Sequence, residues 1–407
     1  MVRRFFKLAR KKNTVMEQSN DNGSRKMSLE ERRKNLNQLI QSINTQRNEV
    51  SCGFISDENI KSQIDVQFIP TPNDDLNKAV GGGFPRGRLS IVSGLSDSGK
   101  TSLVLESIGL MMKKDPDFIA LWLETEQSLS FEYAVSQFKI DPERFVFIRS
   151  TDEGGEEALD KCIAILKSKM VDIFCINSLR ALVPKSELNK SITEDTVAMQ
   201  ARMNTKALKQ IMQASYSGNI ATIVIQHLTT MIGTMSRDPY ALGGGLLLKY
   251  GGLLILDMRK QSILDSDPIS RDEGMKVMIS VKKNHIVPRV NPYVKVPHFI
   301  VYGEGTETIL STLNRAIEQG ILRKSGAWIY WDDKQLSWQG KEKFRMKCKE
   351  DPDFLQELKN LTNNNIQSLS EEEIKELGIS PEGDKKELEL VEITLNDEDN
   401  NESEVED

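Results

Sequence analysis

The sequence lacks several features that would place it in well-known classes of protein. No run of 18 or more uncharged apolar residues occurs among its 407 residues, which argues against a membrane-spanning helix and a membrane partner. Its four cysteines include no CxxC pair, and none of its three histidines stands near them at zinc-ligand spacing, so neither a disulfide scaffold nor a structural zinc is expected. Residues 1–12 carry no small-residue cleavage site, so we expect a protein of the reducing cytoplasm rather than a secreted one.

Charge is distributed unevenly along the chain. The formal net charge is −6, but residues 371–407 contain 16 acidic and 3 basic residues, which leaves a net charge of +7 on the residues before them. A dense block of like charge stays solvated, so we predict a disordered acidic tail over residues 366–407. Such a tail either adds solubility or competes with a polyanion for a basic surface.

The N-terminal part is expected to hold one helix between two irregular segments. Residues 1–26 are basic and polar, which is typical of a disordered leader. Ser28, followed three residues later by Glu31, forms the capping-box pattern, so we predict a helix over residues 29–46. Its single apolar stripe needs cover from the protein's own body or from a neighbouring subunit. Residues 27–75 are therefore expected to be an oligomerisation helix and a polar linker.

Short apolar runs that alternate with helical stretches predict an α/β core over residues 76–305. Continuous apolar strands are typical of a mostly parallel sheet that is buried on both faces. After Gly251 the runs are joined by short loops without helices, which favours antiparallel strands that extend the sheet. Residues 306–365 predict a small α+β lobe in which Trp328, Trp331 and Trp338 fill the core of a hairpin between two helices. The expected strands are 89–92, 118–123, 145–148, 173–176, 221–225, 253–258, 277–281 and 298–302.

One motif predicts nucleotide binding. Residues 94–101 match GxxxxGK[ST], follow an apolar strand and open an amphipathic helix. The backbone N–H groups of such a loop cradle phosphates, its lysine reaches the terminal phosphates, and its threonine hydroxyl binds Mg²⁺. The candidate residues are Gly94, Ser96, Asp97, Ser98, Gly99, Lys100, Thr101 and Ser102.

Polar residues end three of the predicted strands, at the edge where a parallel sheet binds its ligand. Glu124 or Glu126 can orient or deprotonate a water that attacks the γ-phosphate, or can simply cap the following helix. Asn177 stands where an NTPase of this type normally has an aspartate on the metal side; it can accept a hydrogen bond from a metal-bound water but adds no charge. His227 precedes a long loop over residues 228–242 and can pass the presence of the γ-phosphate to it, although a buried core histidine is the alternative.

Further blocks accompany the phosphate loop in a fixed order. They are GGGFPRGR at 81–88, ETE at 124–126, YA at 133–134, GEEAL at 155–159, NSLRAL at 177–182, ARM at 201–203, GG at 244–245, KY at 249–250, KNH at 283–285, YGEG at 302–305 and SGAW at 325–328. Over residues 29–361 the chain thereby resembles a RecA-type recombinase, and the acidic tail matches as well. The resemblance implies a RecA-like ATPase core with an N-terminal helix and a small C-terminal lobe.

The resemblance implies roles for individual residues of the ATP site. Glu126 falls on the catalytic glutamate, and Tyr133 falls on the residue that stacks on adenine. His227 falls on the switch glutamine, where a histidine is similar to phage recombinases of the UvsX kind. Lys283 and His285 fall on two lysines that reach the ATP of the neighbouring subunit, although His285 replaces a fixed cation with a titratable one. We thus predict Lys100, Glu126 and His227 as catalytic residues.

The resemblance also implies two DNA-binding loops, at residues 186–197 and 228–242. The second loop departs from the family pattern, because Thr229 replaces an arginine and Ser236 a phenylalanine. Arg237 and Tyr240 can supply the missing charge and stacking, or can be ordinary solvated loop residues. Arginine, lysine and backbone N–H groups in these loops would hold phosphates without reading bases. The predicted DNA-binding residues are Arg202, Thr205, Lys209, Arg237, Tyr240, Gly244 and Gly245.

The function implied is ATP-dependent homologous strand exchange in recombination and repair. Its partners would be single-stranded DNA, homologous duplex DNA, further copies of the chain in a helical filament, and single-strand-binding or loader proteins. The departures at Asn177, His227 and His285 favour a divergent, virus-encoded member. Two alternatives stay open: a hexameric DNA helicase with the same fold, and a non-catalytic DNA-binding filament protein that uses ATP as a switch.

Overall fold

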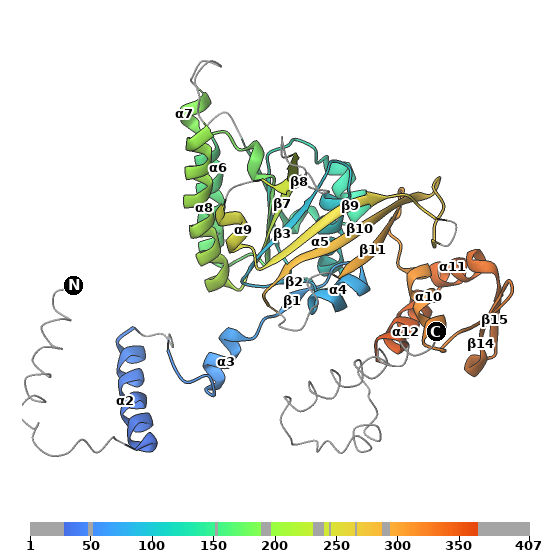
Figure 1. The fold of residues 1–407 in the computed structure, drawn as a ribbon, viewed down its shortest axis with the longest axis horizontal. Coiled ribbons are helices and arrows are strands. Elements are labelled where there is room, and N and C mark those ends of the chain that lie inside the picture. Colours follow the sequence, from blue (N-terminus) through green and yellow to red (C-terminus); the bar gives the residue numbers. More distant parts are fainter. Residues whose placement is uncertain are drawn as a thin grey trace, which may run out of the picture. The chain divides into compact units, whose positions relative to one another are not determined.

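The computed structural model describes residues 28–47, 52–150, 154–188, 197–230, 240–243, 246–264, 267–286 and 294–364. They form two compact units, one ending at Val66 and the other starting at Gln67 (Figure 1). No helix in these ranges is both long and apolar enough to cross a membrane. The expected leader over residues 1–26 and the expected acidic tail over residues 366–407 lie outside the described residues.

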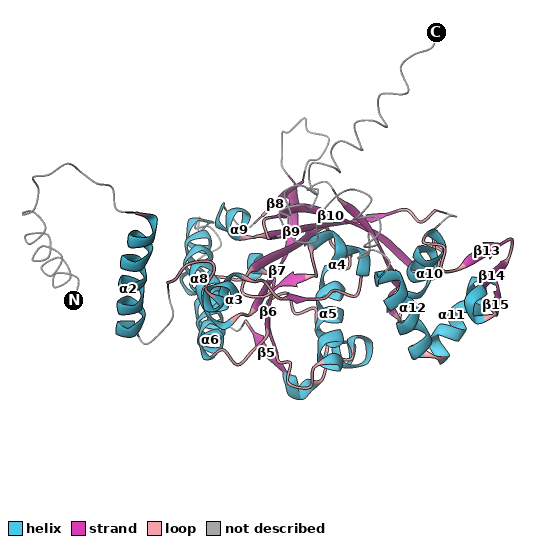
Figure 2. Ribbon diagram, turned by 90° about the horizontal axis from the view of Figure 1, so that it is seen from below, coloured by secondary structure: helices cyan, strands magenta, loops and turns pink. Residues whose placement is uncertain are grey.

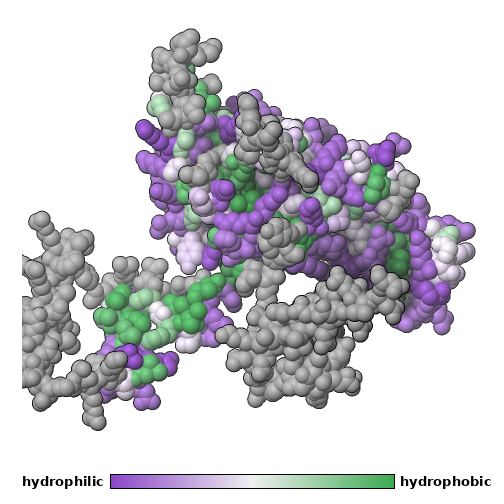
Figure 3. All heavy atoms as spheres, in the orientation of Figure 1, coloured by the Kyte–Doolittle hydropathy of each residue, from purple (hydrophilic) through white to green (hydrophobic). Residues whose placement is uncertain are grey.

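The first unit contains α2 (Leu29–Arg47) and α3 (Glu58–Ile64). The capping box that begins α2 is confirmed: the Glu31 N–H donates to Ser28 Oγ at 3.2 Å, and the Ser28 N–H donates to Glu31 Oε2 at 3.0 Å. Asn44 binds the backbone of Cys52 through both ends of its amide, at 2.8 and 3.2 Å. Apolar side chains gather on the surface of this unit in Figure 3; Leu36 and Leu39 on α2 are about half exposed.

The segment expected to be a linker is more ordered than the sequence indicated. It contains α3, β1 (Phe68–Ile69) and the first residues of α4 (Asp74–Val80), and β1 pairs with β2 (Phe84–Pro85) in a two-stranded antiparallel sheet. Both helices begin with a side-chain cap, from Asp57 and from Asn73. Each helix has only seven residues, so its apolar pattern is too short to be recognised by periodicity.

The second unit is built on one large mixed sheet, which confirms the predicted α/β class. Its order is β12-β11-β10-β9-β3-β7-β6-β4-β5, with β8 paired to β7. The strands from β9 to β5 along this path are parallel, and β10, β11 and β12 extend the sheet in antiparallel pairs, as expected. The strand β9 departs from the expectation, because it is antiparallel to β10 but parallel to β3. The bounds are β3 (Leu89–Gly94), β4 (Ala120–Glu124), β5 (Phe145–Arg149), β6 (Ile173–Asn177), β7 (Ala221–Thr230), β8 (Tyr240–Leu242), β9 (Leu254–Gln261), β10 (Gly274–Asn284), β11 (Lys295–Val301) and β12 (Gly305–Thr306).

Helices cover both faces of this sheet (Figure 2). One apolar core lies between the sheet and the helices α4 and α5 (Lys100–Lys114). The other lies against α6 (Gly155–Ser168), α8 (Val197–Gly218) and α9 (Leu246–Gly251), and the short α7 (Lys185–Leu188) precedes α8. The edge strand β5 departs from the expectation of burial on both faces, because Val146 and Phe147 are 38% and 46% exposed.

The strand β7 is longer than predicted. It continues past His227 to Thr230 and pairs with β8, so Leu228–Thr230 and Tyr240–Leu242 form two arms of a hairpin instead of loop. The β-branched Thr229 suits a pleated strand, which favours the extension. The candidate loop residues therefore start from a rigid extension of the central sheet.

The C-terminal lobe contains α10 (Ile309–Glu318), a three-stranded antiparallel sheet, α11 (Gly340–Glu350) and α12 (Pro352–Asn364). The sheet is β13 (Arg323–Ser325), β14 (Trp328–Trp331) and β15 (Leu336–Gln339), so the lobe has one strand and one helix more than predicted. Trp331 is buried and Trp338 packs edge-on against Phe344, whereas Trp328 is 41% exposed. The core interpretation thus holds for two of the three tryptophans.

Candidate active site

The phosphate loop joins β3 to α5 and is shaped by two glycines. A Cβ on Gly94 would lie 2.4 Å from the backbone oxygen of Met258 on β9, so no larger residue fits there. Gly99 has φ +76° at the N-cap of α5, and a Cβ there would lie 2.5 Å from Ile300 Cδ1. The loop therefore lies directly on the sheet, and its backbone leads into the first turn of a helix, where unpaired N–H groups favour an anion.

Lys100 is 5% exposed and lies within the loop. Its Nζ donates to the Leu95 carbonyl at 2.6 Å, and the Ser98 hydroxyl donates to the same carbonyl at 2.8 Å. Burial lowers the pKa of Lys100, while the negative charges of Glu126 and Asp97 raise it. Ser96 and Asp97 are exposed at the tip of the loop, and Thr101 and Ser102 are half-buried in the first turn of α5. The loop thus has the arrangement that a phosphate-binding loop needs, with a buried lysine and the first turn of a helix directly after it.

The two carboxylates after β4 have different environments, which separates the alternatives for them. Glu124 is 1% exposed and accepts hydrogen bonds from Trp122 Nε1 at 2.9 Å, the Glu126 N–H at 3.0 Å and Asn177 Nδ2 at 3.0 Å. A carboxylate so fully bonded inside the protein is not available to a water. Glu124 is therefore a structural group, and Glu126 is the candidate for catalysis.

Glu126 follows the end of β4 and contacts residues just after β6 and within β7. The Ser178 hydroxyl, just after β6, donates to Glu126 Oε1 at 2.6 Å, and His227 Nε2 on β7 lies 3.1 Å from the same oxygen. The Glu126 side chain remains 25% exposed and that of His227 30% exposed, so both can meet a ligand. Ser178 was not predicted as a site residue, although its place directly after a strand-end residue is a usable signal.

Asn177 is fully buried. Its Nδ2 donates to Glu124 and also lies 3.5 Å from Ser128 Oγ, while its Oδ1 has no partner among the described residues. No group of three or more His, Cys, Asp or Glu side chains in the described ranges could hold a metal ion. A hydroxyl and a buried amide oxygen do fit Mg²⁺, which prefers oxygen ligands and keeps several of its own waters.

The other predicted nucleotide residues lie on the turn Tyr133–Gln137, on β10 and just after β10. Tyr133 begins a π-helical turn, is 46% exposed and contacts Phe138 edge-on at 4.9 Å between ring centroids. Lys283 on β10 donates to the Tyr250 carbonyl at 3.0 Å, and burial lowers the pKa of Lys283. His285 is exposed just after β10. Within the described part of the chain, neither Lys283 nor His285 bonds to the phosphate loop.

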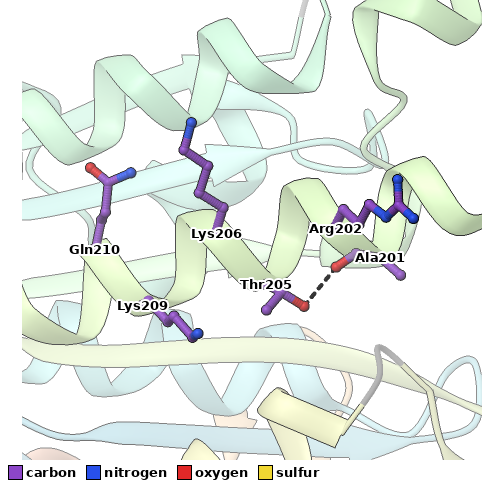
Figure 4. A pocket seen from close by; sticks show the side chains of 6 residues that line it. All are labelled: Ala201, Arg202, Thr205, Lys206, Lys209 and Gln210. Atoms are coloured by element: carbon purple, nitrogen blue, oxygen red, sulfur yellow. Dashed lines mark hydrogen bonds between the residues drawn. The ribbon is translucent and has the colours of Figure 1, made fainter.

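The candidate DNA residues of α8 share one exposed face. Arg202, Thr205 and Lys209 line a hollow of about 550 Å³ together with Ala201, Lys206 and Gln210 (Figure 4). The Thr205 hydroxyl donates to the Ala201 carbonyl at 2.7 Å. Lys206 was missed, although it stands one helical turn after Arg202 and so shares its side of the helix.

The hairpin that follows His227 holds further candidates. Tyr240 is half-buried on β8, with the Arg259 guanidinium 5.5 Å from its ring centroid. At Thr229, where the resemblance expects an arginine, the Arg180 guanidinium donates to the threonine hydroxyl at 3.3 Å, so a neighbouring segment supplies the positive charge. Arg237, Gly244 and Gly245 lie outside the described residues.

Comparison with known proteins decides the family. The RecA N-terminal domain model matches residues 34–307, and the RecA C-terminal domain model matches residues 311–367. The chain belongs to the RecA family. It is 34% identical to Protein RecA of Corynebacterium glutamicum over 296 residues, which cover 72% of this chain and 75% of that protein. It is 33% identical to Protein RecA of Saccharopolyspora erythraea and 32% identical to Protein RecA of Aquifex aeolicus, with 82% and 83% of those proteins covered.

Membership of the RecA family confirms the fold and the class of activity. The chain is a RecA-type recombinase, an ATP-dependent enzyme of homologous recombination, with a P-loop ATPase core and a RecA C-terminal domain. The helicase and the non-catalytic switch are not favoured by these matches. The relatives named here are bacterial, and a viral origin stays a prediction.

Proposed function

We propose that this RecA-family recombinase hydrolyses ATP at the ends of β3, β4 and β6, inside a helical filament on single-stranded DNA. The observation that carries the proposal is the position of Glu126. Its carboxylate contacts Ser178 and His227 and is partly exposed to solvent. Its negative charge also favours the protonated form of Lys100. One carboxylate thus contacts the γ-phosphate side of the site and the strand that leads to the candidate DNA loop.

The residues of the phosphate loop would bind ATP in the manner that their geometry favours. The N–H groups of residues 96–101 surround the phosphates, and Lys100 exchanges the Leu95 carbonyl for phosphate oxygens. Mg²⁺, held by the Thr101 hydroxyl and phosphate oxygens, would neutralise part of the phosphate charge. Tyr133 offers an exposed ring on which adenine can stack.

Glu126 is the general base of the proposal. Its carboxylate orients a water and accepts its proton during attack on the γ-phosphorus, a role that contributes about 10²–10⁴-fold to rate. The Ser178 hydroxyl and His227 hold the carboxylate in place before that step. When hydrolysis removes the γ-phosphate, the contacts of Glu126 and His227 change together.

His227 is the link between ATP and DNA. It lies in the middle of β7, and the arms of the β7–β8 hairpin begin at the next residue, Leu228. A shift of the His227 ring is therefore carried along a single strand to the hairpin. The face of α8 around Arg202 and Lys209 gives the positive charge that a DNA backbone needs.

The assembly supplies the remaining parts of the site. Lys283 and His285 would reach the ATP of the next subunit, the exposed apolar side of α2 would dock on a neighbouring copy, and the C-terminal lobe would gather homologous duplex DNA. Single-strand-binding and loader proteins would assist filament formation in the cytoplasm. The residues of the acidic tail would regulate access to the basic surface.

The test is ATP hydrolysis with and without single-stranded DNA, for the wild-type chain, Lys100→Ala and Glu126→Gln, with electron microscopy of the same samples. The proposal predicts open helical filaments and DNA-stimulated turnover that both substitutions abolish. Filaments whose turnover DNA does not stimulate would support the switch alternative instead. Closed rings would contradict the filament and support the helicase.

A further inference from the structure

Glu124 and Asn177 form a buried polar pair beside the proposed ATP site. They are direct partners in the register between β4 and β6, and they are 1% and 0% exposed. Asn177 Nδ2 lies 3.0 Å from Glu124 Oε2 and 3.3 Å from Glu124 Oε1. Glu124 ends β4, two residues before Glu126, and Asn177 ends β6, directly before Ser178.

The chemistry of the pair fixes which way the Asn177 amide faces. An ionised carboxylate can only accept hydrogen bonds, so Glu124 must face the NH₂ group of the amide. The amide oxygen is thereby turned away from Glu124, and it has no partner among the described residues. A buried carbonyl oxygen without a hydrogen bond is costly, so the arrangement favours a ligand or a bound water at that atom.

The backbone around the pair is also held. The Thr125 hydroxyl donates to the carbonyl oxygens of Asn177 and Ser178, at 3.0 and 2.8 Å, and the Ser178 N–H donates back to Thr125 Oγ1 at 2.8 Å. Trp122 Nε1 fixes Glu124 from the other side at 2.9 Å. The Asn177 Nδ2 also lies 3.5 Å from Ser128 Oγ, a longer contact, so Glu124 is the main partner that fixes the orientation of the amide.

We propose that Glu124 is a positioning residue for Mg²⁺: it fixes the Asn177 amide so that its Oδ1 accepts a hydrogen bond from a water of the nucleotide-bound ion. The negative charge that an aspartate at position 177 would place beside the ion lies here on Glu124, one strand away. The inference rests on the proposed ATP site, and it explains why a neutral residue can stand at position 177. Partners behind a metal's own ligands commonly change metal affinity by about 10–100-fold when removed.

The proposal predicts different effects on Mg²⁺ binding when the carboxylate and the amide are replaced at positions 124 and 177, singly or together. In Glu124→Gln the new amide can donate to Asn177, so the Asn177 side chain can turn over and present its NH₂ group to the ion. In Asn177→Asp two carboxylates would lie about as close as the present pair, and their repulsion would be relieved either by a proton on one of them or by Mg²⁺. In the double variant the new amide at position 124 donates to the new carboxylate at position 177, which again presents an oxygen to the ion.

The experiment measures binding of a fluorescent ATP analogue to the full chain while Mg²⁺ is titrated, with a thermal melt of each variant. We expect Glu124→Gln to raise the Mg²⁺ concentration at half-maximal binding about tenfold, with little change in binding in EDTA. The double variant Glu124→Gln/Asn177→Asp should return within about threefold of the wild type, since it restores an acceptor. Glu132→Gln, the same substitution at an exposed glutamate, is the control and should change nothing.

Two results would overturn the inference. One is a Glu124→Gln chain whose Mg²⁺ midpoint stays within twofold of the wild type, and the other is a double variant no better than the single. If Glu124→Gln does not fold, Asn177→Asp decides: its melting temperature must rise more with Mg²⁺ and nucleotide than that of the wild type. A wild-type chain that binds nucleotide without any Mg²⁺ dependence would instead contradict the proposed ATP site itself.

Discussion

At the ends of β4 and β6 the polar side chains are buried and bonded within the chain, whereas on α8 they are exposed around an open hollow. Glu124, Asn177 and Ser178 are each no more than 1% exposed. Arg202, Thr205 and Lys209 lie on the surface and line about 550 Å³ of open space. The polar groups of the first region already have partners within the chain, as a preorganised catalytic site requires, whereas Arg202 and Lys209 would find theirs on DNA in the proposed filament.

This difference in burial predicts that substitutions in the two regions have different effects and a different dependence on salt. Substitutions at the strand ends should change chemistry or stability and should depend little on salt, because buried interactions are weakly screened. Substitutions on α8 should leave the fold and ATP binding intact and should change only the salt-dependent affinity for DNA.

Glu126→Gln should lower the turnover number by about 10²–10⁴-fold, because the amide cannot accept a proton from water. Nucleotide affinity should change little, since the phosphate loop is untouched. The measurement is steady-state ATP hydrolysis with single-stranded DNA. Glu132→Gln, at an exposed glutamate of the same segment, is the matched control. A Glu126→Gln chain that keeps more than a tenth of wild-type turnover would contradict this assignment.

His298 on β11 should make the fold sensitive to acid. It is fully buried, and desolvation lowers its pKa to about 4 from the usual 6.5. The unfolded chain therefore binds a proton that the folded chain does not between these values, so stability falls as the pH falls through this window. The expected loss is about 3 kcal/mol from pH 7 to pH 4 for this one group.

Urea unfolding of the wild type at several pH values measures that slope, and His298→Gln should flatten it because glutamine does not titrate. The new amide can still accept from Asn73 Nδ2, which lies 3.3 Å from His298 Nδ1. His285→Gln changes an exposed histidine and serves as the control. An unchanged slope in His298→Gln would show that other groups cause the acid sensitivity.

Gly94→Ala should destabilise the second unit by about 2 kcal/mol, since the new Cβ forces the phosphate loop away from β9. The clash is with a backbone oxygen at 2.4 Å, which cannot rotate away. Gly303→Ala is the comparison: Gly303 has φ +76° but nothing within 4 Å, so only the backbone conformation is strained, at about 1 kcal/mol. Thermal melts of both variants measure the loss of stability. A larger drop in melting temperature for Gly303→Ala than for Gly94→Ala would contradict the prediction.

Arg202→Ala and Lys209→Ala should each weaken binding of single-stranded DNA by only a small factor. Each loses one phosphate contact, so the slope of log affinity against log salt should fall by about 0.7 per substitution. Lys113→Ala, at an exposed lysine on α5, should leave the slope unchanged. Equal slopes for all three variants and the wild type would remove α8 from the DNA site.

Local signals in the sequence were enough to predict most of the scaffold. Continuous apolar runs gave the strands of the central sheet, and the pair Ser28 and Glu31 gave the start of α2. The seven-residue helices α3 and α4 and the extension of β7 were missed, because each depends on caps or on a pairing partner rather than on a long pattern.

The site was predicted in its parts but not in its connections. The phosphate loop and the carboxylates after β4 were found by spacing, yet nothing local separates Glu124 from Glu126. Burial and hydrogen bonds separate them, and the bond from Ser178 to Glu126 joins residues 52 positions apart. Such contacts exist only once the strand order is known, which places β6 next to β4.

DNA stimulation of ATP hydrolysis in His227→Ala tests whether His227 couples the proposed ATP site to the β7–β8 hairpin. The ring lies 3.1 Å from Glu126 on the strand that enters the hairpin. We expect His227→Ala to bind both ATP and single-stranded DNA and to turn over more slowly without DNA, because Glu126 loses one of its partners, and we expect DNA to give no further stimulation. Stimulation at the wild-type ratio in this variant would contradict the account.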